Sequence, residues 1–249
     1  EENQQLDQVT PNSADAEVST VSVDADGTTA TQESQKQTSS ATAPPKERAP
    51  RVVLNDGSKM PIVGLGVYQA EDGNETYQAV LHALKVGYRH IDTAALYANE
   101  ESVGKAVKDS GIPREQIWIT TKLWALNAID SDDPYQYTLQ DVEERVEKLG
   151  TYIDLYLTHS PHGGPKARIA IWKAMQELKQ SGKVKSIGIS NYGSRQIEEL
   201  LADSGTTIKP AVNQIELHPF LTQTAIVDTC KKHGIQVSAY SPVSPCCMS

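Results

Sequence analysis

The chain has 249 residues, of which 38% are hydrophobic, and its formal net charge is −9. No apolar run reaches the roughly 18 residues that a membrane-spanning helix needs, so no membrane partner is expected. Residues 1–45 hold eight acidic residues and one basic residue, a net charge of −7, and −9 minus −7 leaves −2 for the remainder. This near-neutral remainder excludes the basic patch that nucleic acid requires, so no nucleic-acid partner is expected.

Residues 1–50 are predicted to form a disordered acidic arm. They contain no Phe, Trp, Tyr or Ile and are rich in Ser, Thr and Gln, so they cannot bury enough apolar surface to offset the entropy of ordering. Pro44, Pro45 and Pro50 mark a linker, and order is predicted to begin near Arg51. A solvated tail is the simplest interpretation, and an interaction module is the alternative.

Residues 51–249 are predicted to form one domain of alternating strands and helices. A hairpin with its turn at Asn55, Asp56 and Gly57 precedes a first core strand over 62–67. Further strands are predicted over 90–94, 117–122, 152–159, 185–190, 211–215 and 235–240. Helices are predicted over 75–86, 100–110, 138–149, 167–180, 194–202 and 222–233.

This alternation predicts a parallel α/β sheet, either open or closed into a barrel. The Gly64-Leu65-Gly66 segment lacks the third glycine of the dinucleotide fingerprint. Polar residues follow many of the strands, and a TIM-type (β/α)8 barrel collects its active site from many strand ends. We therefore predict a barrel with seven strands before the chain stops, lacking the last strand-helix unit.

The three cysteines are Cys230, Cys246 and Cys247. Their spacing matches neither a disulfide framework nor a metal motif. We therefore predict no metal site and a reducing, cytoplasmic location.

Four residues near the ends of strands suit the reduction of a carbonyl group: Asp92, Tyr97, Lys122 and His159. The reaction needs a hydride donor and an acid that protonates the oxygen. A free tyrosine, with a pKa of about 10, is a weak acid at neutral pH, and a neighbouring ammonium lowers that pKa. We expect Lys122 to supply this charge, Asp92 to hold Lys122 by an ion pair, and His159 to donate a hydrogen bond to the substrate oxygen.

Each member also has a structural interpretation. Asp92 and Lys122 can be a structural ion pair between adjacent strands, His159 a hydrogen-bonded core residue, and Tyr97 an ordinary loop aromatic. The conjunction of all four at the ends of predicted strands favours a catalytic site.

The segments that carry these residues resemble the motifs of the aldo-keto reductase family, in the family's order, from about Val52 to Pro242. They are 87–94 with Tyr97, Asn99 with Glu100, 121–124, 154–159, 188–191, 213–219 and 239–242. The resemblance implies a (β/α)8 barrel that binds NADPH without a Rossmann domain and reduces an aldehyde or ketone to an alcohol. It implies that Tyr97 is the general acid and that the substrate is a small-molecule carbonyl compound. We also expect the protein to be a monomer.

The resemblance also implies the residues that contact the cofactor and the substrate. The nicotinamide carboxamide would be held by Ser190, Asn191 and Gln214. Tyr240 would stack on the nicotinamide ring. The substrate would be contacted by Tyr68 and Trp124.

Two departures from the family pattern stand out. Ser160 follows His159 where many relatives carry a Trp that lines the substrate pocket. The last seven residues, 243–249, replace an eighth strand and the segments that grip the adenosine 2′-phosphate in relatives. The alternative hypothesis is therefore a catalytically impaired, truncated product, from splicing or a gene-model error, with weak or no cofactor binding.

Overall fold

The computed structural model describes residues 46–47 and 49–243. The arm predicted for residues 1–50 lies outside these residues except at its last positions, and so do Cys246, Cys247 and the ending of the chain. Among the described residues, Cys230 is buried with a free thiol. No helix in this part of the chain is long and apolar enough to cross a membrane.

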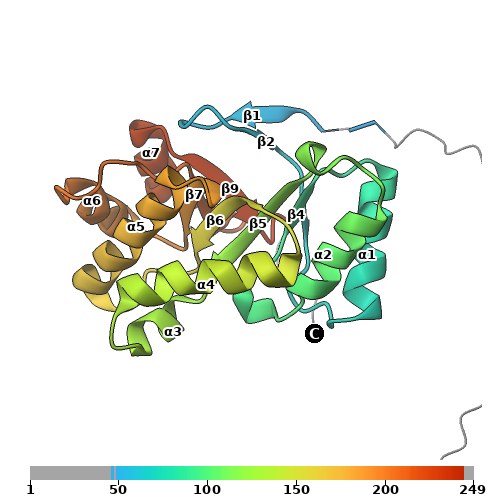
Figure 1. Ribbon diagram of the computed structural model, residues 1–249. Coiled ribbons are helices and arrows are strands. Elements are labelled where there is room, and N and C mark those ends of the chain that lie inside the picture. Colours follow the sequence, from blue (N-terminus) through green and yellow to red (C-terminus); the bar gives the residue numbers. More distant parts are fainter. Residues whose placement is uncertain (1–45, 48, 244–249) are drawn as a thin grey trace, which may run out of the picture. The chain divides into compact units, whose positions relative to one another are not determined.

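The barrel is a seven-stranded sheet in the order β3-β4-β5-β6-β7-β8-β9, and every neighbouring pair is parallel. The strands are β3 (Leu65–Gly66), β4 (His90–Asp92), β5 (Trp118–Leu123), β6 (Ile153–Thr158), β7 (Val184–Ser190), β8 (Val212–Glu216) and β9 (Gln236–Tyr240). Figure 1 shows the helices packed around the outside of these strands. The structure thus confirms the predicted α/β barrel, which is nearly closed, with β3 and β9 at the sheet edges of the described part.

The helices alternate with the strands, as predicted. They are α1 (Asn74–Val86), α2 (Glu100–Asp109), α3 (Ala125–Asp130), α4 (Pro134–Leu149), α5 (Gly164–Gln180), α6 (Ser194–Ala202) and α7 (Thr224–His233), with 3-10 turns η1 (Ala95–Tyr97) and η2 (Arg114–Gln116). Helix α3 was not predicted from the sequence, because its six residues are too few to show a helical period. Helix α4 begins four residues earlier than predicted because the Asp133 side chain caps it, accepting the amides of Tyr135 and Gln136.

The first barrel strand is shorter than predicted. A strand was expected over 62–67, but β3 spans Leu65–Gly66 alone. Ile62 and Val63 are 56% and 47% exposed, and the amide of Ile62 donates to the carbonyl oxygen of Pro50 at 3.0 Å. This segment therefore continues the N-terminal hairpin instead of joining the barrel.

The predicted hairpin is present and closes one end of the barrel. Strands β1 (Arg51–Val53) and β2 (Lys59–Pro61) pair antiparallel, and Gly57 takes a φ of 86° in the turn, a left-handed conformation that favours glycine. Leu54 and Met60 form a buried apolar cluster with residues near the starts of the strands, including Trp118. The carboxyl ends of the strands, at the opposite face, remain available for polar side chains.

Helix α2 can approach α4 closely because Gly104 has no side chain. A Cβ atom on Gly104 would lie 2.2 Å from the carbonyl oxygen of Leu149, the last residue of α4. The contact bears on the site because α2 starts at Glu100, shortly after Tyr97.

We expect Gly104→Ala to lower the melting temperature in a thermal scan, although alanine normally stabilises a helix interior by about 1 kcal/mol relative to glycine. A clash with backbone belongs at the upper end of overpacking costs, which run to about 3 kcal/mol. The matched control is Gly193→Ala, whose Cβ would meet the flexible side chain of Gln196 alone. A melting temperature for Gly104→Ala at or above that of the parent chain would contradict this packing.

Candidate active site

The structure brings the four predicted catalytic residues together at one end of the barrel, where the strands have their carboxyl ends. Asp92 is the last residue of β4, and Tyr97 ends η1, the turn that follows it. Lys122 lies in β5 near its carboxyl end, and His159 directly follows β6. Parallel strands present their carboxyl ends on the same face, so residues far apart in the sequence meet there.

Lys122 is the centre of this group. Its side chain is 1% exposed, and its ammonium forms an ion pair with Asp92. The same ammonium donates to the carbonyl oxygen of Thr93 at 2.9 Å and to the hydroxyl of Tyr97 at 3.2 Å. These three partners replace the water that the buried charge has lost.

The pKa of Lys122 keeps the side chain charged. Burial acts to lower this pKa, but Asp92 and Tyr97 together more than offset it, so it lies above the ordinary value of 10.5. Lys122 is therefore a fixed positive charge beside Tyr97 at any neutral pH.

The structure corrects one expectation about Tyr97. Lys122 was expected to bring the pKa of Tyr97 below its ordinary value. Instead, burial raises the pKa of Tyr97 above 10.0, and Lys122 opposes this rise without cancelling it. The reason is that the phenolate would lose more hydration on burial than the neighbouring ammonium restores.

His159 is held in its neutral form. Burial and the charge of Lys122 lower the pKa of His159 from 6.5 to about 4, against the opposing effect of Asp92. Its ring centre lies 5.6 Å from that of Tyr97, nearly perpendicular to it. A neutral imidazole keeps one N–H that can donate a hydrogen bond.

Two aromatic side chains flank this group. The ring of Tyr68 lies 5.0 Å from that of Tyr97, and the ring of Trp124 lies 5.2 Å from that of His159. Tyr68 is 64% exposed, so it stands at the rim of the site. Ser160 is buried, and its hydroxyl has no hydrogen-bond partner among the described residues.

The four residues expected to hold the cofactor form a hydrogen-bonded chain at the ends of β7, β8 and β9. The Tyr240 hydroxyl donates to the Asn191 side-chain oxygen at 2.9 Å, and the Asn191 amide donates to the carbonyl oxygen of His159 at 2.9 Å. Ser190 donates to the carbonyl oxygen of Gln214 at 2.8 Å. These hydrogen bonds reach the predicted catalytic group through the carbonyl oxygen of His159.

Two features of the site were not predicted from the sequence. The side-chain amide of Gln214 donates to Asp92 Oδ2 at 2.7 Å, which joins the expected cofactor group to the predicted catalytic group. Thr93, through its carbonyl oxygen, is a third partner of the Lys122 ammonium. A backbone acceptor leaves no signal in the sequence, and the contact of Gln214 with Asp92 spans 122 residues.

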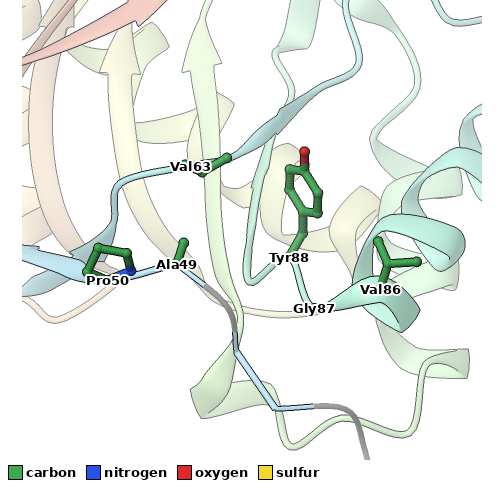
Figure 2. Close-up of a pocket in the computed structure, with 6 residues that line it drawn as sticks. All are labelled: Ala49, Pro50, Val63, Val86, Gly87 and Tyr88. Carbon is green, nitrogen blue, oxygen red and sulfur yellow. The ribbon is translucent and has the colours of Figure 1, made fainter.

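Two hollows elsewhere on the described part contain none of these residues. Figure 2 shows the residues that line the first, a cavity of about 390 Å³ whose lining side chains are apolar except for that of Tyr88, which ends in a hydroxyl. Its walls come from Ala49 and Pro50, from Val63, and from the segment 86–88 that precedes β4, so it lies away from the carboxyl ends of the strands. The second, of about 480 Å³, lies between charged residues of α2 and α4.

Comparison with known proteins agrees with this geometry. The sequence profile of the Aldo/keto reductase family matches residues 62–246. The 9,11-endoperoxide prostaglandin H2 reductase of Trypanosoma cruzi is 45% identical over 193 residues, which are 77% of this chain and 65% of that protein. The glyoxal reductase of Bacillus subtilis is 46% identical over 193 residues, which are 77% of this chain and 67% of that protein.

Solved structures share the fold. The aldo-keto reductase of Bombyx mori, solved in complex with NADP, superposes with a TM-score of 0.69 at 39% identity, covering 78% of this chain and 66% of that chain. The chain thus spans about two thirds of the length of the relatives that it matches. With the profile matched over most of its length, and with the strand order and the site described above, the chain belongs to the aldo/keto reductase family.

Proposed function

We propose that the protein reduces aldehydes or ketones to alcohols, with NADPH as the hydride donor and Tyr97 as the acid that protonates the carbonyl oxygen. One observation carries this proposal. The buried ammonium of Lys122 lies 3.2 Å from the Tyr97 hydroxyl and is paired with Asp92. A charged lysine held against a phenol in this way is suited to a tyrosine that gives up its proton during the reaction.

Tyr97 is protonated before the reaction because its pKa lies above 10.0. Once the carbonyl carbon has gained a hydride, its oxygen is an alkoxide, which is a far stronger base than a phenolate. The proton therefore moves from Tyr97 to that oxygen. Lys122 stabilises the phenolate that remains, and Asp92 keeps Lys122 charged and in place.

His159 has a different role from Tyr97 in this proposal. With a pKa of about 4 it carries no charge at neutral pH. Its N–H donates a hydrogen bond to the carbonyl oxygen, which polarises the carbonyl group and orients it toward Tyr97. A charged imidazolium at this position would repel Lys122, and this repulsion contributes to the low pKa.

The expected cofactor residues fit a nicotinamide. Asn191 and Gln214 carry side-chain amides at adjacent strand ends, and two amides offer the donors and acceptors that complement a carboxamide. Tyr240 is 37% exposed, and its ring offers an aromatic face for stacking. Bound NADPH supplies a hydride to the substrate carbon, and the NADP-bound structure of the Bombyx mori relative supports this choice of cofactor.

The substrate is proposed to be a small molecule with a reactive carbonyl group. Tyr68 and Trp124 flank the catalytic group and would contact the rest of the substrate. The relative from Bacillus subtilis is named a glyoxal reductase, which supports an aldehyde. Aromatic aldehydes also suit the two flanking rings.

We expect Tyr97→Phe to lower kcat for aldehyde reduction by about 10²–10⁴-fold, the usual contribution of a general acid. NADPH affinity should stay unchanged, because Tyr97 lies outside the proposed cofactor contacts. The matched control is Tyr77→Phe, which loses a hydroxyl bonded to Asp109 on the surface. The measurement is NADPH oxidation with a panel of small aldehydes that includes an aromatic one. The reductase proposal fails if the parent protein oxidises no NADPH with any of them.

The pH dependence of kcat follows from the pKa shifts of Tyr97 and His159. Tyr97 stays protonated until the pH passes its raised pKa, and His159 stays neutral above a pH of about 4. We therefore expect kcat for reduction to be flat between about pH 6 and 9, and to fall only as the pH approaches the Tyr97 value. Alcohol oxidation should instead speed up with rising pH, because the phenolate then acts as the base. A fall in reduction near about pH 7–8 would point to another acid.

Stacking by Tyr240 can be tested with two substitutions. We expect Tyr240→Leu to weaken NADPH binding about tenfold or more, because an aromatic ring stacked on a base contributes about 1–3 kcal/mol. Tyr240→Phe keeps the ring and loses only the hydrogen bond to Asn191, so it should bind NADPH nearly as well as the parent. Binding is followed by quenching of tryptophan fluorescence. Equal weakening by both substitutions would assign the effect to the hydroxyl instead.

A further inference from the structure

Asn99 is a buried side chain that the proposed mechanism does not use. It is 0% exposed and lies two residues after Tyr97, at the start of α2. Its amide donates to the carbonyl oxygens of Val67 at 2.9 Å and Ala70 at 3.1 Å. Its side-chain oxygen accepts the Thr93 hydroxyl at 2.8 Å. Both amide hydrogens and the oxygen are thus engaged, and they join the exits of β3 and β4.

The contact with Thr93 leads directly to Lys122. Thr93 is 0% exposed, and its carbonyl oxygen accepts the Lys122 ammonium at 2.9 Å. Asn99 therefore accepts the hydroxyl of Thr93, and Thr93 in turn accepts the Lys122 ammonium at its backbone carbonyl.

Glu100 makes the corresponding connection to β5. One carboxylate oxygen accepts the Thr121 hydroxyl at 2.5 Å, and the other is paired with Arg145 of α4 at 2.7 Å. Thr121 is the neighbour of Lys122 in β5. Asn99 and Glu100 together attach the segment that carries Tyr97 to three strand exits and one helix.

The backbone conformation between Tyr97 and Asn99 indicates that surrounding contacts hold this segment in place. Ala98 takes a φ of 55° in the left-handed region, a conformation that is unfavourable for a residue other than glycine. Such a conformation persists only where the surrounding contacts determine it. Here the η1 turn fixes one side, with the Ala98 amide bonded to the Ala95 carbonyl at 3.2 Å, and Asn99 fixes the other.

We propose that Asn99 and Glu100 are positioning residues, which keep the Tyr97 hydroxyl and the Lys122 ammonium at hydrogen-bonding distance by tying the Tyr97 segment to the exits of β3, β4 and β5. This inference rests on the proposed function of Tyr97 and Lys122. The competing interpretation is a stabilising role alone. The two differ because a positioning role affects the chemical step more than substrate or cofactor binding.

Four variants separate these roles. Asn99→Ala removes all three hydrogen bonds, and Thr93→Val removes only the hydroxyl bond to Asn99 with little change of shape. Thr93→Ser restores that hydroxyl. The matched control is Gln176→Ala. Gln176 is a buried amide of α5 that bonds Gly205, Thr207 and Ile208. These three partners lie in the α6–β8 connection, at the opposite end of the strands.

We expect kcat to fall about tenfold or more in Asn99→Ala and Thr93→Val, since small misplacements of reacting groups cost up to about 10²-fold. The KM for the aldehyde and the Kd for NADPH should stay within about twofold of the parent values. Thr93→Ser should recover most of the lost kcat. Gln176→Ala should lower the melting temperature with kcat retained. If Asn99→Ala does not fold, Thr93→Val with its serine counterpart decides alone. The positioning role would be overturned by an unchanged kcat in Thr93→Val, or by a loss of kcat in Gln176→Ala equal to that in Asn99→Ala.

A second readout does not depend on activity. In protein with ¹³C-labelled tyrosine Cζ, the Tyr97 signal is assigned by its absence in Tyr97→Phe, and its pKa is followed by NMR titration. Thr93→Val should raise this pKa further, because it loosens the ammonium that opposes the effect of burial. Thr93→Ser and Gln176→Ala should leave it unchanged. A parent protein without reductase activity would contradict the proposed function only. An unchanged pKa of Tyr97 in Thr93→Val would contradict the positioning role.

Discussion

The arrangement of the site depends on one physical constraint, the buried ammonium of Lys122. A lysine side chain that is 1% exposed cannot remain charged without partners. It finds them in the Asp92 carboxylate, the Thr93 carbonyl and the Tyr97 hydroxyl, all supplied by β4 and the segment that follows it. The need to compensate this charge therefore fixes β5 against β4, and the same contacts place the phenol where a proton can be transferred.

The rest of the barrel is arranged so that this charge lies at the open end. The β1–β2 hairpin fills the other end with Leu54 and Met60, packed near the starts of the strands. At the carboxyl ends, hydrogen bonds run from Tyr240 through Asn191 to His159, and from Gln214 to Asp92. The residues that suit a nicotinamide and the residues that suit a carbonyl group thus share one network, so the two parts of the site are expected to respond to each other. The exits of β3, β4 and β5 are tied together behind this network by Asn99 and Glu100.

Much of the architecture could be predicted from the sequence. The alternation of β-branched runs with amphipathic segments indicated seven strands and their helices, because both patterns are local. The glycine at the hairpin turn indicated the hairpin for the same reason, and the polar residues at strand ends indicated a cluster, which the structure brings together. The prediction for the segment 62–64 was wrong because a non-local contact decides it: the Ile62 amide bonds to Pro50, so this segment follows the hairpin. Helix α3 was missed for a different reason, since its six residues are too few to show a helical period.

By itself, the sequence determined which chemical groups are present and the order in which strand ends present them. It therefore determined the family and the candidate residues Asp92, Tyr97, Lys122 and His159. Only the tertiary structure decided the protonation properties of these groups. Burial raises the pKa of Tyr97 where Lys122 alone would lower it, and it brings the pKa of His159 to about 4. A side chain loses its hydration only when segments distant in the sequence close over it, so the resulting pKa shift cannot be predicted from its neighbours in the sequence. The same holds for the hydrogen bonds that Gln214, Thr93 and Asn99 make with distant residues.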